Sequence, residues 1–105
     1  MFAVIYAFHV QPGQAGAFEI AWRELTMLIY QYEGSLGSRL HRQDEATYIA
    51  YAQWPDRQTW AQSGDKLPPE AKEASARMRA ACTQIETLYE LDSIDDLLQP
   101  QLSQG

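Results

Sequence analysis

The chain has 105 residues and a net charge of −6, and 46% of its residues are hydrophobic. This length suits a single domain, and the apolar content argues against a disordered chain. The acidic balance, with a pI near 4.7, argues against nucleic-acid and anionic-membrane partners, because both attract basic surfaces. We therefore expect one domain over residues 1–98, followed by a flexible tail over residues 99–105.

The N-terminus is apolar for only ten residues, MFAVIYAFHV, and has neither a basic flank nor a small-residue cleavage site. It therefore predicts a strand rather than a signal peptide or a membrane span. Cys82 is the only cysteine, so no internal disulfide is possible. This usage is typical of a reducing compartment, and we expect a cytoplasmic protein.

The first half of the chain predicts a strand followed by a long helix. Residues 2–10 are largely apolar on both faces, which is typical of a strand covered on both sides. A Pro-Gly turn at 11–13 leads into a helix over 14–33, whose apolar residues recur at three- and four-residue spacing. Gly34 is suited to end that helix, because glycine tolerates a left-handed backbone.

A hairpin is predicted next. Residues 36–42 and 47–54 alternate as strands, and the polar residues 43–46 form a connection of hairpin length. Pro55 stops the second strand, and residues 56–62 predict a short helix.

The last third of the chain predicts a helix and a final strand. A helix opens at the prolines of 67–70 and runs to about Cys82, with that thiol on its apolar face. Residues 85–92 predict the last strand, and residues 95–98 a final helical turn. Three acids on one face of that strand suggest an edge strand kept soluble by charge: Glu86, Glu90 and Asp92.

The order β-α-β-β-α-β predicts an α+β, ferredoxin-like fold, with an antiparallel sheet and the helices on one face. At least two of its strands are apolar on both faces, so the face without helices would expose a large apolar patch. A second copy packed sheet to sheet would cover it, and we therefore expect a homodimer.

Several segments together resemble the antibiotic biosynthesis monooxygenase-like (ABM) domain family. They are the strand end and turn FHVQPG at 8–13, Phe18 and Trp22 on the helix, EGSLGSRLHR at 33–42 and YIAYAQWPD at 48–56. The resemblance covers roughly residues 2–98 and implies a dimeric α+β barrel. Characterised members oxidise polycyclic aromatic polyketides with dioxygen and without metal or flavin, or degrade haem.

The sequence departs from both characterised kinds of member. They use an asparagine on the first strand, whereas this chain has no asparagine and places Tyr6 near that position. The haem-degrading kind also uses a histidine on the helix after the third strand, but both histidines here come earlier. Trp60 is out of step with that kind's helical tryptophan by about one turn, three to four residues.

The resemblance and the aromatic content together suggest a site. The candidate catalytic residues are His9 or His41 as base and Arg39 as anion partner. The candidate substrate-binding residues are Trp22, Tyr51, Trp54 and Trp60. The structural alternatives are histidines at a sheet edge or dimer face, an ion pair for Arg39, and plain core packing of the aromatics.

The first functional hypothesis is a cofactor-independent monooxygenase that encloses a small aromatic or polyketide-like compound, deprotonates it and stabilises its anion for reaction with dioxygen. The alternative is a non-catalytic, dimeric ligand-binding or accessory domain, and haem degradation ranks last. We expect no metal or cofactor, because no ligand set, glycine-rich phosphate loop or CxxC pair is present. Cys82 is expected to be a buried structural thiol.

Overall fold

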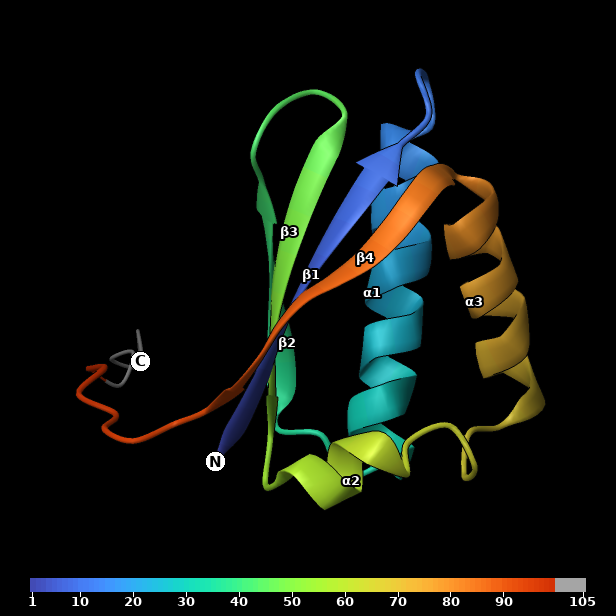
Figure 1. Cartoon of the computed structure of the whole chain (residues 1–105). Coiled ribbons are helices and arrows are strands. Elements are labelled where there is room, and N and C mark those ends of the chain that lie inside the picture. The colour runs from blue at the N-terminus through green and yellow to red at the C-terminus, as the bar shows by residue number, and fades with distance from the viewer. Residues whose placement is uncertain (100–105) are drawn as a thin grey trace, which may run out of the picture.

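The computed structural model describes residues 1–99, which form one antiparallel sheet of four strands with helices on one face (Figure 1). The elements in chain order are β1 (Phe2–Val10), α1 (Ala15–Tyr32), β2 (Gly37–Arg42), β3 (Thr47–Trp54), α2 (Arg57–Ala61), α3 (Pro69–Ala80) and β4 (Cys82–Asp92). The strand order is β2-β3-β1-β4. The predicted α+β, ferredoxin-like fold is confirmed.

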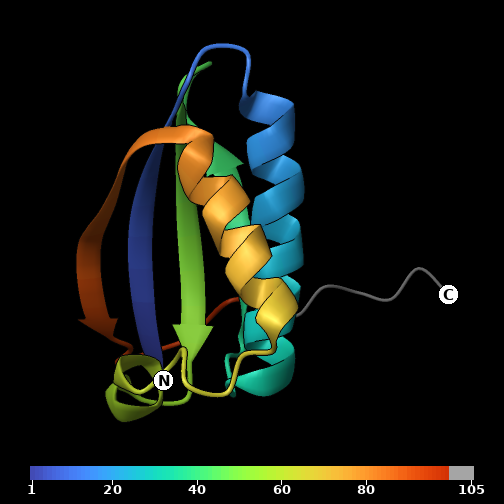
Figure 2. The same ribbon diagram turned by 90° about the vertical axis from the view of Figure 1, so that its right-hand side faces the viewer.

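Strand β1 lies in the middle of the sheet, and its two faces have different surroundings. Along its edges it pairs antiparallel with β3 and with β4. Its even-numbered side chains face α1 and α3, which pack side by side on the same face of the sheet (Figures 1 and 2). Its odd-numbered side chains face the other way, toward a surface that none of the described helices covers, which we call the open face (Figure 1).

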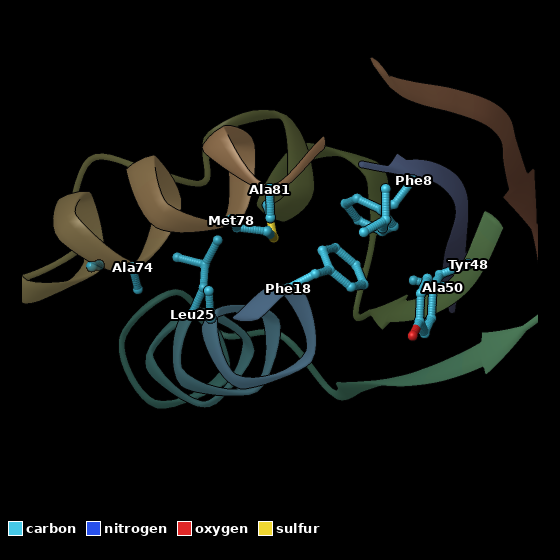
Figure 3. Close-up of a cluster of buried hydrophobic side chains, with 11 residues drawn as sticks. Phe8, Phe18, Leu25, Tyr48, Ala50, Ala74, Met78 and Ala81 are labelled. Carbon is cyan, nitrogen blue, oxygen red and sulfur yellow. The ribbon is translucent and has the colours of Figure 1, made fainter. Parts of the chain in front are cut away.

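The core lies between the sheet and α1. Phe18 of α1 is fully buried, and its ring centroid lies 5.1 Å from that of Phe8 and 4.8 Å from that of Tyr48. Figure 3 shows Phe18 packed against both rings from the helix side, with Leu25 and Met78 completing the cluster from the helices. These contacts fix α1 against the strands by burying large apolar side chains.

The predicted boundaries of α1 are confirmed, because Gln14 and Glu33 are its caps. Gly34 follows with φ +78°, a left-handed backbone that a side chain would disfavour. The buried Glu33 carboxylate accepts a hydrogen bond from the Gly64 backbone N–H, which ties the end of α1 to the loop after α2.

Two predicted segments near the C-terminus are wrong. Helix α3 ends at Ala80, and Cys82 begins β4, because Cys82 pairs with Val10 and continues the sheet instead of the helix. Residues 95–98 form no helical turn and leave the apolar Ile94, Leu97 and Leu98 exposed. A single turn with nothing to pack against is not stable alone. Of the predicted tail at 99–105, residues 100–105 lie outside the described residues.

The edge position of β4 is confirmed, but its acids do not share one face. The pairing register with β1 shifts at Leu88, the extra residue of a β-bulge. Glu86 therefore lies opposite Ala7 and faces the open side, whereas Glu90 lies opposite Val4 and faces the helices. One extra residue reverses the alternation of all residues after it. No helix within residues 1–99 is long and apolar enough to cross a membrane.

Candidate functional site

A cavity of about 540 Å³ lies between the sheet and the helices. This volume falls in the range of small-molecule sites in proteins. Its walls carry four aromatic side chains: Tyr6, Phe8, Trp22 and Trp54. Its remaining apolar lining comes from β3, α1, α3 and β4: Ala50, Ala52, Leu25, Ile29, Met78 and Ile85. The cavity thus has flat, apolar walls.

The space arises from small residues in the middle of the sheet. Ala50 and Ala52 of β3 lie opposite Tyr6 and Val4 of β1, and both face the helices. An alanine side chain fills little of the roughly 10 Å between packed layers, so space remains between the alanine and the helices. Trp22 of α1 is half-buried and lines this space from the helix side.

The polar part of the lining is rich in donors. It comprises Tyr6, Thr26, Ser38, Arg79, Thr83 and Gln84, together with the Cys82 thiol. No carboxylate or histidine of the described residues lines the cavity. Burial raises the pKa of the Cys82 thiol, so it is protonated at neutral pH. The cavity can therefore hold an acceptor atom but offers no conventional base.

Tyr6 is held by a tryptophan from outside the cavity. The indole N–H of Trp60 donates to the Tyr6 hydroxyl at 2.9 Å. Burial raises the pKa of Tyr6, the Trp60 hydrogen bond opposes this in part, and the nearby Glu90 carboxylate adds to the rise. Tyr6 is consequently a neutral phenol over the physiological pH range.

The local sequence explains why Trp60 reaches Tyr6. Pro55 follows the last residue of β3, and Asp56 caps α2 by accepting from the Thr59 backbone N–H at 2.7 Å. This cap starts α2 immediately under the end of the sheet. Trp60 then packs on Phe2, with their ring centroids 5.5 Å apart.

A surface contact braces the same end of the sheet. The Arg57 guanidinium lies 4.6 Å from the centroid of the Phe2 ring and donates to Glu90 at 2.6 Å. Both charged side chains are about half exposed, so the ion pair adds little stability. It nevertheless depends on the bulge at Leu88, which turns Glu90 toward α2.

Trp54 has an unusual polar atom. The residue is only 4% exposed, and its indole N–H has no hydrogen-bond partner among residues 1–99. A buried unpaired donor costs about 1–3 kcal/mol in desolvation.

The predicted catalytic residues lie on the opposite side of the sheet. His9 is on the open face, where its Nε2 is 2.9 Å from a carboxylate oxygen of Glu86. Arg39 and His41 project from β2 to the same face, because they pair with Tyr51 and Ile49 of β3. None of the three lines the cavity.

The predicted aromatic residues are divided between the two sides. Trp22 and Trp54 line the cavity, and Trp60 reaches its wall through Tyr6. Tyr51 lies on the open face, where its hydroxyl accepts from Gln53 at 3.3 Å.

Sequence reasoning missed Phe8, Ser38 and Arg79 as lining residues. Phe8 lies at an even-numbered position of β1, like the other large side chains that face the helices, so the alternation of the strand could have identified it. The position of Arg79 depends on how α3 packs, which the sequence does not specify. Among residues 1–99, no group of three or more His, Cys, Asp or Glu side chains could hold a metal ion.

Comparisons with known proteins agree with this architecture. SnoaB from Streptomyces nogalater, described as a cofactor-independent oxygenase, is 18% identical with a TM-score of 0.74, covering 93% of this chain and 97% of its own. A Caulobacter crescentus protein described as a candidate antibiotic biosynthesis monooxygenase is 24% identical with a TM-score of 0.71, covering 90% of each chain. Rv0793 from Mycobacterium tuberculosis is 15% identical with a TM-score of 0.71, covering 92% of this chain and 98% of its own.

These identities establish a shared fold and no shared activity. No curated protein matches the chain. The family model described as antibiotic biosynthesis monooxygenase, however, matches residues 1–78, which is well over half of the sequence. The chain belongs to the antibiotic biosynthesis monooxygenase family.

Proposed function

We propose that the protein is a cofactor-independent monooxygenase that oxidises a flat aromatic compound in the cavity between the sheet and the helices. The observation that carries the proposal is the cavity itself, about 540 Å³ with four aromatic wall residues. Family membership and the description of SnoaB as a cofactor-independent oxygenase support the reaction class.

The reaction requires only that the protein enclose the substrate and stabilise the substrate anion. An acidic phenol or a benzylic CH₂ flanked by aromatic rings loses a proton, and its electron-rich anion transfers an electron to dioxygen. When a CH₂ becomes C=O, one oxygen atom enters the product, and the other leaves as water with the two hydrogens. The substrate supplies all the electrons, so the reaction balances without another reductant.

The cavity suits a substrate that ionises readily. No carboxylate or histidine of the described residues lines it, but Arg79 of α3 does. A guanidinium favours an anionic oxygen near it. Arg79 therefore takes the role of anion partner that the sequence suggested for Arg39.

Oxygen consumption with a panel of polycyclic phenols tests the proposal. Wild-type protein should accelerate oxygen uptake for at least one of them. Ser38→Phe, which places a ring into the cavity from β2, should lower kcat/KM by about tenfold or more, because displaced substrates lose the reactive geometry. Met27→Phe adds the same ring at an exposed position of α1 and should leave the rate unchanged.

The roles predicted for His9, His41 and Arg39 stay predictions, and their position on the open face argues for contacts between subunits instead. If they act as base or anion partner, replacing them by alanine will reduce turnover by orders of magnitude. We expect turnover to change by less than about twofold, since surface changes away from a site have small effects.

A second candidate function is binding without chemistry. The absence of an acid–base group from the lining, among residues 1–99, specifically favours it. Ligand binding without oxygen uptake would support this candidate, and a failure to bind any aromatic compound would contradict both. Haem degradation fits poorly, because neither histidine lines the cavity to ligate an iron.

We further propose a homodimer through the open face. Ile5, Ile49 and Tyr51 are only half-buried there, and Tyr89 and Leu91 of β4 are 61% and 45% exposed. The segment after β4 runs away from the helices (Figure 1), and its apolar residues Ile94 and Leu97 are exposed. A second copy packed on the open face would remove its apolar side chains from water.

A further inference from the structure

We propose that the Tyr6 hydroxyl, positioned by Trp60, is the hydrogen-bond donor that binds a neutral carbonyl oxygen of the ligand. The proposal rests on the proposed function in one respect, that the cavity between sheet and helices is the ligand site. It adds which atom of the ligand is recognised and by which side chain of the cavity lining.

The first argument is the direction of the hydrogen bond. Tyr6 accepts from the Trp60 indole N–H at 2.9 Å, and an indole N–H only donates. The phenolic proton of Tyr6 is therefore free to donate elsewhere. No acceptor for it is found among residues 1–99, and Tyr6 lines the cavity. A ligand oxygen is the partner that this donor lacks.

The second argument is charge. The pKa of Tyr6 is raised, so the hydroxyl keeps its proton and remains a donor. The Glu90 carboxylate contributes to that rise, and it is the acid that pairs with Arg57 behind α2. Glu90 pairs with Val4 and so faces the same side of the sheet as Tyr6. An anionic ligand oxygen at Tyr6 would be repelled by this carboxylate, so the recognised oxygen is neutral.

The cavity lining offers two kinds of donor. Tyr6 supplies a neutral hydroxyl, and Arg79 supplies the one guanidinium of the described lining. A ligand that carries both a carbonyl oxygen and an acidic hydroxyl complements this pair. The carbonyl lies at Tyr6, and the anionic oxygen lies toward Arg79.

The role of Trp60 is positioning. It does not line the cavity, but its N–H fixes the hydroxyl of Tyr6, and its ring is fixed in turn by Phe2. A hydroxyl that already accepts from one side has fewer orientations open to its proton. The preorganised donor loses less entropy when a ligand oxygen arrives.

A pair of shape-matched probes tests this without turnover. 1-Tetralone carries one acceptor oxygen on a fused ring, and tetralin lacks it. Calorimetric titration of the wild-type protein should show tighter binding of the ketone. Tyr6→Phe should weaken ketone binding by about three- to tenfold, the worth of one net hydrogen bond, and leave tetralin binding unchanged.

Two further variants make the test specific. Trp60→Phe should reduce the preference for the ketone over the hydrocarbon, an effect that a general loss of packing would not produce. Tyr48→Phe is the matched control, because it removes a tyrosine hydroxyl that donates to Glu19 at 2.5 Å outside the cavity lining. Its ketone preference should equal that of the wild type.

The outcomes separate this proposal from the oxygenase proposal. Equal loss of both probes in Tyr6→Phe, an unchanged ketone affinity, or no ketone binding at millimolar concentration would each overturn the role of Tyr6. Ketone discrimination by Tyr6 together with no oxygen uptake from any phenol would instead support the role of Tyr6 and remove the oxygenase.

Discussion

The two faces of the sheet differ although the same strands build both. The face under the helices carries the aromatic cavity, and the polar side chains that line this cavity are neutral or cationic, Tyr6 and Arg79 among them. The open face mixes half-buried apolar side chains with a His9–Glu86 pair. A binding cavity and a surface for another subunit place different demands on side chains, and one strand meets both by alternation.

The largest expected effect lies on the helix-covered face. Phe18→Ala removes a fully buried ring that packs on Phe8 and Tyr48, and it should lower the free energy of unfolding by about 3–5 kcal/mol. Chemical denaturation measures it. Tyr89→Ala on the open face is the comparison, and at a protein concentration where the chain is monomeric its effect should be much smaller. Equal effects would contradict the division into a core face and an open face.

The next effect concerns the open face. Ile5→Lys places a charge in the centre of the proposed dimer interface and should weaken dimerisation by about a hundredfold or more, since an unpaired charge in an apolar interface costs several kcal/mol. Light scattering at micromolar concentration reports the mass. Ile20→Lys, at an exposed position of α1, is the matched control and should stay dimeric. A wild-type mass of one chain would refute the interface.

The next effect is that of the hydrogen bond between Trp60 and Tyr6 on the cavity side of the sheet, which a double-mutant cycle measures. The coupling between Tyr6→Phe and Trp60→Phe should be about 0.5–1.5 kcal/mol, the net worth of a partly buried neutral hydrogen bond. Urea denaturation of the four proteins gives the number. A coupling near zero would show that the Trp60 N–H does not hold the hydroxyl.

The smallest effect is expected for the equivalent cycle on the open face. At a protein concentration where the chain is monomeric, His9→Ala and Glu86→Ala should couple by about 0.2–1 kcal/mol, as partly exposed pairs do. The four proteins of this cycle, measured in the same way, allow direct comparison with the Tyr6–Trp60 cycle. A coupling that exceeded the cavity-side value would mean that the pair is shielded from water.

Most of the fold was predictable because its signals are local. The helix over 14–33 and the strands at 2–10 and 47–54 follow from periodicity, Gly34 and Pro55. The bulge at Leu88 was not predictable, because nothing in the composition of β4 marks the extra residue. Because this residue was not foreseen, Glu86 and Glu90 were wrongly predicted to share one face of the strand.

The candidate site was predictable in part. Trp22 and Trp54 were found because aromatic residues on core-facing positions also line any cavity in that core. Arg39, His9 and His41 were grouped with them because a strand that is apolar on both faces does not reveal which face meets the helices. That choice depends on tertiary packing of α1 and α3 over the sheet.

The single cysteine gives the cavity a natural attachment point for a spectroscopic label. Cys82 lines the cavity and is the only thiol in the chain, so a thiol-reactive fluorophore would label that wall without any substitution. Because burial raises the pKa of this thiol, labelling requires mildly alkaline solution, and bound ligand should slow it. Protection from labelling would report occupancy for compounds that are neither coloured nor oxidised.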